Sequence, residues 1–293
     1  MKFECILCPV DFSEVSLRAC EYAYSLARHY GAKLYFQSVI EPLTATYPYY
    51  YVPEQINLIY SDLAAQAEQQ LRDLVWKQGF GSVHPGLVAQ QGPLAQSILA
   101  FAEAHKVDLI VMGTHGRGGL DRLMIGSVTE KVLRRSACPV LAVRKPAHDF
   151  VSHGKDQEPV TLHKILFCTD FSDAAGKSLA QALSLAMEYN AELTLIHVLE
   201  HPDTSEILQE RTAAAMRELE KSIPADARNW CNVRKLVRVG KPYQEICQVA
   251  LEDQIDLIVL GVRGRNAVDL AIFGSTTHRV LQLGPCPVLT VRA

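Results

Sequence analysis

The sequence predicts an α/β protein made of two doubly wound domains, each with a five-stranded parallel sheet in the strand order 3-2-1-4-5. Apolar strand-like segments alternate with amphipathic helix-like segments, which is typical of parallel sheets with helices on both faces. The second half repeats the first, because ILCPVDFS at 6–13 is answered by ILFCTDFS at 165–172, and CPVLAVR at 138–144 by CPVLTVR at 286–292. Right-handed crossovers then place the early strands on one side of the first strand and the later strands on the other.

Caps and composition define the first three elements. The apolar run at 3–10 is expected to be the first strand. Ser13 is a suitable N-cap for a helix over 14–30, and Gly31 is a suitable end for it. Residues 32–40 are rich in aromatic and β-branched side chains and predict the second strand.

Periodicity and glycine or proline signals define the rest of the first half. Residues 54–77 carry apolar side chains at three-to-four spacing and predict a long helix. The loop before it, 42–53, holds four tyrosines between prolines, which we interpret as a lid or packing surface in preference to a platform for stacking on a base. Further strands are expected near 84–90, 107–113 and 138–144, and further helices over 94–105 and 127–136.

A polar segment without apolar periodicity divides the two repeats. It predicts domain 1 over 1–146, a linker over 147–162 and domain 2 over 163–293.

Composition excludes several classes of partner and points to a small-molecule role. The 29 basic and 32 acidic side chains give a formal charge of −3, so neither nucleic acid nor membrane is expected as a partner. The chain shows no apolar run long enough for a leader or a membrane span, and we expect it in the cytoplasm. Cys5 and Cys8 form a CxxC spacing, but residues three apart on a strand face opposite sides of a sheet, so a metal or redox site is not favoured there.

A glycine and serine frame follows the fourth strand of each half. GTHGRGGLDRLMIGS at 113–127 and GVRGRNAVDLAIFGS at 261–275 share the spacing G-x2-G-x9-G-S. Glycines let a ligand approach bare backbone N–H groups, and a helix N-terminus favours an anion, so the frame predicts phosphate binding. The alternatives are a plain turn and, in the first half, a capping box of Ser127 with Glu130, whose counterpart in the second half is His278.

Charged residues near each frame are candidates for the same site. Asp11 and Asp170 follow the first strand of each half, at the switch point where open α/β sheets bind ligands. We expect them to accept hydrogen bonds from ribose or adenine, the alternative being that each only caps the next helix. Arg117 and Arg265 are candidates to neutralise phosphate, or are solvated loop charges. No GxGxxG turn follows the first strand and no Walker sequence occurs, so neither NAD binding nor P-loop chemistry is predicted.

On these residues the chain resembles a tandem universal stress protein of the nucleotide-binding type. The two frames, the two aspartates and the CPV segments at Cys138 and Cys286 carry the resemblance, which covers both halves. It implies a Rossmann-like, adenine nucleotide alpha hydrolase-like fold with a site for ATP or AMP in each half, with or without Mg²⁺. In such a site the frame holds phosphates through backbone amides and the serine hydroxyl, while the aspartate and the second strand hold the adenosine.

The resemblance also implies which residues bind, and where the halves differ. The implied nucleotide-binding residues are Pro9, Asp11, Val39, Met112, Gly113, Gly116, Arg117, Gly126, Ser127 and Val128 in the first half, and Thr169, Asp170, Val198, Leu260, Gly261, Gly264, Arg265, Gly274, Ser275 and Thr276 in the second. Pro9 becomes Cys168 and Gly118 becomes Asn266, so equal affinity of the two halves is not assumed.

These patterns predict a protein that binds a ligand and regulates a response, with no catalytic step of its own. We find no convincing general base, nucleophile pair or metal-binding carboxylate cluster in the sequence. We therefore predict an adenine-nucleotide-binding sensor or regulator of the stress response, with a slow ATPase or nucleotidyl transferase as the alternative and a scaffold with vestigial loops disfavoured. An apolar fifth strand would leave an exposed edge in each half, so we expect 140–144 to pair with 288–292 within the chain. A further homodimer and an unidentified protein partner are left open.

Overall fold

The computed structural model describes residues 2–41, 53–115, 124–144, 149–151, 159–200, 205–225, 227, 232–262 and 274–292. The first half contains β1 (Cys5–Pro9), α1 (Glu14–Tyr30), β2 (Lys33–Ile40), α2 (Pro53–Gln78), the short 3-10 helix η2 (Phe80–Val83), β3 (Gly86–Gln91), α3 (Leu94–Ala104), β4 (Leu109–Gly113), α4 (Ser127–Arg135) and β5 (Val140–Val143). The second half contains β6 (Lys164–Cys168), α5 (Asp173–Tyr189), β7 (Glu192–Leu199), α6 (Ser205–Ser222), β8 (Val233–Val239), α7 (Pro242–Glu252), β9 (Leu257–Val262), α8 (Ser275–Leu283) and β10 (Val288–Arg292).

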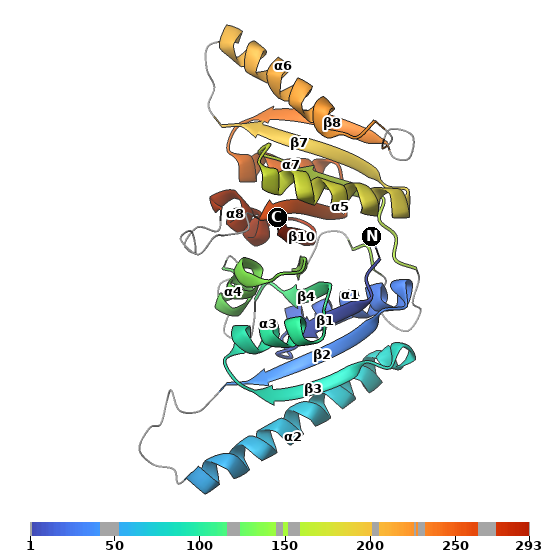
Figure 1. The fold of residues 1–293 in the computed structure, drawn as a ribbon, viewed down its shortest axis with the longest axis vertical. Coiled ribbons are helices and arrows are strands. Elements are labelled where there is room, and N and C mark those ends of the chain that lie inside the picture. Colours follow the sequence, from blue (N-terminus) through green and yellow to red (C-terminus); the bar gives the residue numbers. More distant parts are fainter. Residues whose placement is uncertain are drawn as a thin grey trace.

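The described strands form one continuous sheet that runs through both halves (Figure 1). Its order is β3-β2-β1-β4-β5-β10-β9-β6-β7-β8, so each half is parallel and has the predicted order 3-2-1-4-5. The halves meet where β5 and β10 pair antiparallel, with Leu141 opposite Leu289. This joint confirms the expected intramolecular pairing, and it covers the edge that each half would otherwise expose.

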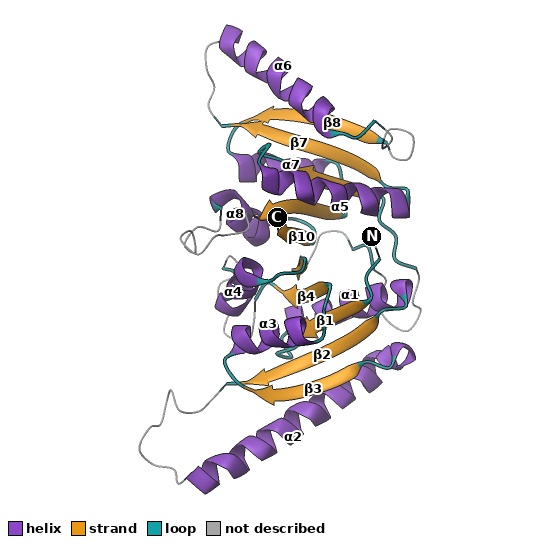
Figure 2. Ribbon diagram, viewed as in Figure 1, coloured by secondary structure: helices purple, strands orange, loops and turns teal. Residues whose placement is uncertain are grey.

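Helices cover both faces of the sheet and create two apolar cores (Figure 2). Residues of α1, α2, α5 and α6 contribute to one core, and residues of α3, α4, α7 and α8 to the other. Cys8 belongs to the first core and Cys5 to the second. The strand therefore separates the two thiols of the CxxC spacing, as its period of two requires.

Helix α1 has the ends that the sequence predicts. Ser13 is its N-cap, and the Ser13 hydroxyl oxygen accepts a hydrogen bond from the N–H of Ser16 at 3.3 Å. Gly31 follows with φ 65°, a left-handed conformation in which glycine is favoured because it has no Cβ. The cap fixes the loop between β1 and α1, which is where Asp11 lies.

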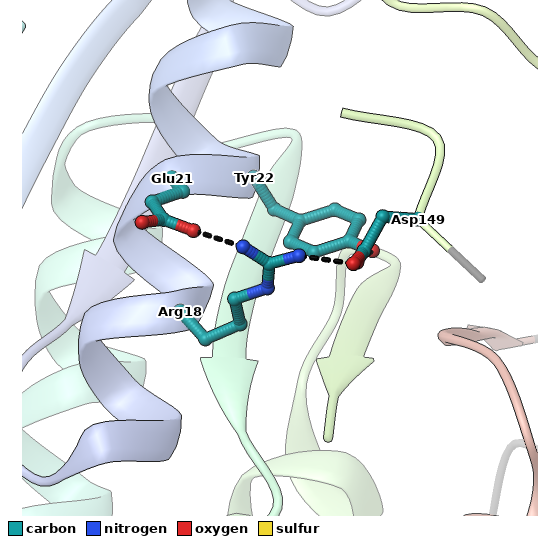
Figure 3. A network of polar contacts seen from close by, with 4 residues as sticks. All are labelled: Arg18, Glu21, Tyr22 and Asp149. Atoms are coloured by element: carbon teal, nitrogen blue, oxygen red, sulfur yellow. Dashed lines mark hydrogen bonds and ion pairs between the residues drawn. The ribbon is translucent and has the colours of Figure 1, made fainter. Parts of the chain in front are cut away.

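The connection between the halves contains more buried apolar side chains than its polar composition predicts. Phe150, Val151, Val160 and Leu162 are buried, so parts of the predicted linker belong to the core. Asp149 holds this segment against α1: it forms an ion pair with Arg18 and accepts a hydrogen bond from the Tyr22 hydroxyl (Figure 3). The sequence does not reveal this packing, because isolated apolar residues in a polar stretch have no periodicity to detect.

Candidate functional site

A cavity of ≈ 910 Å³ lies at the carboxyl ends of β1, β2 and β4 in the first half. Small-molecule sites in proteins have volumes of about 300–1,000 Å³. The position is the switch point of the strand order, as predicted. The described residues that line it include eight of the predicted ones: Pro9, Asp11, Val39, Met112, Gly113, Gly126, Ser127 and Val128. Gly116 and Arg117 lie outside the described residues.

Asp11 both organises the start of α1 and lines the cavity. Its Oδ1 accepts hydrogen bonds from the Ser13 backbone N–H at 3.0 Å and from the Ser13 hydroxyl at 2.6 Å. Asp11 is therefore not the N-cap itself, but it positions the cap, which is Ser13. A carboxylate has about four acceptor positions on its two oxygens, so this structural role is compatible with a second role toward a ligand.

The first turn of α4 presents backbone donors to the cavity. Gly126 is the N-cap and makes no side-chain capping bond, and its C=O accepts the N–H of Glu130 at 2.9 Å. The N–H groups of Ser127, Val128 and Thr129 therefore precede the first hydrogen bond of the helix. Together with the positive end of the helix dipole, such groups favour an anion.

The capping box considered for Ser127 is not formed. Ser127 is the first residue of α4 and Gly126 is the N-cap, so the serine is one position too late for that motif. Glu130 forms an ion pair with Arg134 one turn further along. The Ser127 side chain is exposed and lines the cavity.

Hydrogen bonds tie the two ends of the glycine frame together. The N–H of Gly126 donates to the Thr114 oxygen at 2.7 Å, and the Thr129 hydroxyl donates to the Gly113 oxygen at 2.9 Å. Gly113 also packs closely against α1, because a Cβ there would lie 3.1 Å from the Ser16 backbone nitrogen. Sequence reasoning assigned this glycine to ligand approach; the structure places it both at the cavity and against the start of α1.

The wall formed by α2 was not predicted as part of the site. Leu63, Gln66, Ala67 and Gln70 line the cavity at the spacing of one helix face. Two glutamines on the apolar face of a helix are a signal that could have indicated a polar ligand beside it. The tyrosine cluster at 47–51, expected to form a lid, lies outside the described residues.

The second half repeats the scaffold of the site. Asp170 Oδ1 accepts the N–H of Ser172 at 3.0 Å, and Gly274 is the N-cap of α8 without a side-chain capping bond. Leu260 and Gly261 lie in β9, Val198 in β7, Thr169 directly after β6, and Ser275 and Thr276 at the start of α8. Gly264 and Arg265 lie outside the described residues.

The strand β7 of the second half differs from its counterpart β2 at the position that would face a ligand. His197 stands where the first half has Ser38, one residue before Val198 and Val39 respectively. Its Nδ1 lies 2.9 Å from the Thr169 oxygen, and its ring centroid lies 4.3 Å from that of Phe171. A large imidazole, packed in place, therefore occupies a position that in the first half holds a small cavity-lining serine.

The described residues contain neither a metal cluster nor a membrane span. No group of three or more histidine, cysteine, aspartate or glutamate side chains is close enough in them to hold a metal ion. In the CxxC spacing, burial raises the pKa of the Cys5 thiol, with a further contribution from Asp108, which disfavours the thiolate that a metal or redox site would use. Among the described helices, none is long and apolar enough to cross a membrane.

Known proteins are similar to this chain over one of its halves or over both. A sequence model described as universal stress protein family matches residues 2–144 and again 161–292. Universal stress protein MJ0531 of Methanocaldococcus jannaschii is 34% identical over 146 residues, which is 48% of this chain and 82% of that protein. A universal stress protein of Mycolicibacterium smegmatis is 24% identical over 294 residues, covering 98% of this chain and 96% of that protein.

A solved structure agrees with the fold. The crystal structure of a universal stress protein from Archaeoglobus fulgidus DSM 4304 superposes with a TM-score of 0.70 at 22% identity, covering 100% of this chain and 99% of that one. Since the family model matches each half separately, the duplication seen in the sequence and in the sheet is a duplication of one family domain. The chain belongs to the universal stress protein family and carries two of its domains in tandem.

Proposed function

We propose that the first half binds an adenine nucleotide, ATP or AMP, and that the chain serves as a sensor or regulator in the stress response of its family. The observation that carries the proposal is the cavity at the switch point, which has the α4 N-terminus at one wall and Asp11 at another. In this arrangement the phosphates lie at Gly126 and Ser127, and the ribose lies at Asp11. The adenine lies beside Val39 and the α2 wall.

The second half is proposed to be the weaker site. The packed His197 imidazole and the replacement of Pro9 by Cys168 support this, because both changes fall where the first half would hold adenosine. The expected stoichiometry is therefore near one nucleotide per chain. Magnesium, if used, would be bound through the phosphates, since the described side chains provide no cluster for it.

A route for a response runs along α4 to the other half. The N-terminus of α4 lines the cavity, while Nη1 of Arg292 in β10 donates to the oxygens of Arg135 at 3.2 Å and Ser136 at 3.4 Å, at the end of the same helix. A displacement of α4 on binding would therefore act directly on the joint between the halves. We propose that ligand binding changes the conformation at this joint, and that a partner protein binds the changed surface.

The test is a count of nucleotides combined with a matched pair of variants. The freshly purified full chain is denatured, the released nucleotide is quantified by ion-exchange chromatography, and the affinities for ATP and AMP are measured by calorimetry. Gly126→Val should abolish binding, because the side chain covers the N–H groups of α4. Its backbone, at φ −60° and ψ 140°, accepts any residue, so the fold should persist.

Gly274→Val is the control, because it makes the same change at the start of α8. A Cβ at Gly274 would meet only the Thr277 hydroxyl, at 3.8 Å, among the described neighbours within 4 Å. This variant should leave nearly all binding in place. A chain that holds no nucleotide, before or after soaking, would refute the proposed function. If Gly274→Val lost nucleotide binding while Gly126→Val kept it, the stronger site would be in the second half, contrary to the proposal.

A further inference from the structure

Two of the chain's five methionines line the cavity of the first half, and they differ in exposure. Met112 in β4 is 4% exposed, whereas Met124, two residues before the N-cap of α4, is 63% exposed. Met187 in α5 and Met216 in α6 are 45% and 37% exposed, and neither is among the described residues that line the cavity. Methionine is usually buried in folded proteins. Among the described methionines, the one most open to solvent therefore lies at the cavity wall.

Met124 lies at the end of the cavity where the proposed phosphate donors are. It begins a run of five consecutive cavity-lining residues, 124–128, and this run continues into the first turn of α4. The next residue, Ile125, is buried, and the N–H of Gly126 donates to the Thr114 oxygen at 2.7 Å. These contacts hold the backbone beside Met124 in place. A chemical change of the Met124 side chain therefore occurs beside the N–H groups of Ser127 and Val128.

An exposed thioether reacts with peroxides. A sulfur lone pair forms a bond to one oxygen of hydrogen peroxide, the O–O bond breaks, and the other oxygen leaves as water with both hydrogens. The sulfur is oxidised by two electrons and the peroxide is reduced. The product, methionine sulfoxide, is polar and chiral, and dedicated reductases return it to the thioether.

We propose that Met124 is an oxidation site through which a peroxide lowers the nucleotide affinity of the first half. The inference rests on the proposed nucleotide site. The sulfoxide oxygen carries a partial negative charge and accepts hydrogen bonds, so it competes with a phosphate oxygen for the N–H groups at the start of α4. In the sequence of the second half, Leu260 and Ile272 stand where the first half has Met112 and Met124. Because neither side chain contains sulfur, this response is confined to the first half.

Peptide mapping tests the order of oxidation. The full chain, freed of nucleotide, is incubated with hydrogen peroxide without denaturant, and its methionine peptides are quantified by mass spectrometry. Sulfoxide should form at Met124 before Met187 and Met216, and last at Met112. Saturating ATP should slow the oxidation of Met124, because the ligand covers the wall that holds it, and should leave the rate at Met187 unchanged.

Calorimetry with ATP measures the consequence of the oxidation. The oxidised chain is first treated with dithiothreitol, which reduces disulfides and sulfenic acids of the cysteines but leaves methionine sulfoxide in place. The ATP affinity should then be lower by about fivefold, the size of one competing hydrogen bond. Sulfoxide reductases for both epimers should restore it.

Three variants assign the effect to one residue. In Met124→Leu, whatever its starting affinity, peroxide should cause no loss. Met187→Leu is the matched control, because it removes an exposed methionine elsewhere, and it should lose affinity as the wild-type chain does. Met124→Gln, with a polar side chain of similar length, should have the lower affinity without any peroxide.

The outcomes separate the inference from the proposal on which it rests. Oxidation of Met187 or Met216 ahead of Met124, unchanged ATP affinity once Met124 is a sulfoxide, or the same loss in Met124→Leu would each overturn the role of Met124 while leaving nucleotide binding intact. An unoxidised wild-type chain that binds neither ATP nor AMP would instead refute the proposed function. If Met124→Leu does not fold, the oxidation order and its protection by ATP decide on the wild-type chain.

Discussion

The two halves of the chain share a scaffold and differ at the edge where a ligand would lie. Both have the strand order 3-2-1-4-5, an aspartate after the first strand and a glycine N-cap on the last helix. At the second strand, however, Gln37 and Ser38 are replaced by Ile196 and His197. The comparison teaches that the two halves keep the same scaffold, whereas their second strands differ beside the place where a ligand would lie.

The largest effect should come from the part that is the same in both halves, the joint. Leu141 is 3% exposed and lies opposite Leu289. Leu141→Lys should lower the free energy of unfolding by at least about 3 kcal/mol, because it buries an unpaired charge. Leu289→Lys should do the same if the joint is symmetric. Urea denaturation gives the values, and Leu251→Lys, at a position that is 58% exposed, is the control. A stable, compact Leu141→Lys chain would contradict the joint.

The next effect should appear when the ligand edge of one half is transferred to the other. Ser38→His places the second half's imidazole at the wall of the cavity, and it should lower the ATP affinity about tenfold by filling space. The reciprocal change, His197→Ser, removes the packed ring and should leave the affinity of the first half unchanged. Calorimetry on both variants checks this, and unaltered affinity in Ser38→His would mean that the halves differ for another reason.

A smaller effect should come from the bond that closes the glycine frame. Thr129→Val removes the hydroxyl that donates to the Gly113 oxygen at 2.9 Å, and should cost about 1 kcal/mol of stability as well as some ATP affinity. Thr277→Val makes the same change at the third residue of α8. It should leave the affinity intact, and a thermal melt with calorimetry on the pair measures both quantities.

The smallest effect concerns a contact made by equivalent residues of the two halves. The Tyr189 hydroxyl donates to the Tyr30 hydroxyl at 3.1 Å, at the ends of α5 and α1. Burial raises the pKa of both phenols, that of Tyr189 to about 12. An unfolded tyrosine, with a pKa of about 10, loses its proton first, so the stability should be complete below about pH 10 and fall as the pH rises toward about 12.

Denaturant midpoints at about pH 8 and about pH 11 measure this loss. Tyr189→Phe should reduce the difference between the two midpoints. The same difference in the variant as in the wild-type chain would exclude Tyr189 as its source.

The fold was predictable because its signals are local and occur twice. The bounds of α1 followed from Ser13 and Gly31, and the strand order followed from the alternation of elements and the handedness of crossovers. The joint followed from an apolar strand at the end of each half. These inferences need only neighbouring residues or general rules of topology.

The site was predictable only along the chain segments that carry its motifs. Asp11 and Gly126 were found from position and spacing, but the α2 wall was missed, because the residues of a helix that face a cavity look like those that face a core.

Because β5 and β10 belong to one polypeptide, their pairing does not depend on the concentration of the protein. A short connection gives the two strands an effective concentration on the order of millimolar, and Asp149 in that connection is held to α1 by its ion pair with Arg18. Two separate domains would part on dilution, whereas these stay together. Each half thus keeps its neighbour even though the two sequences differ at the second strand.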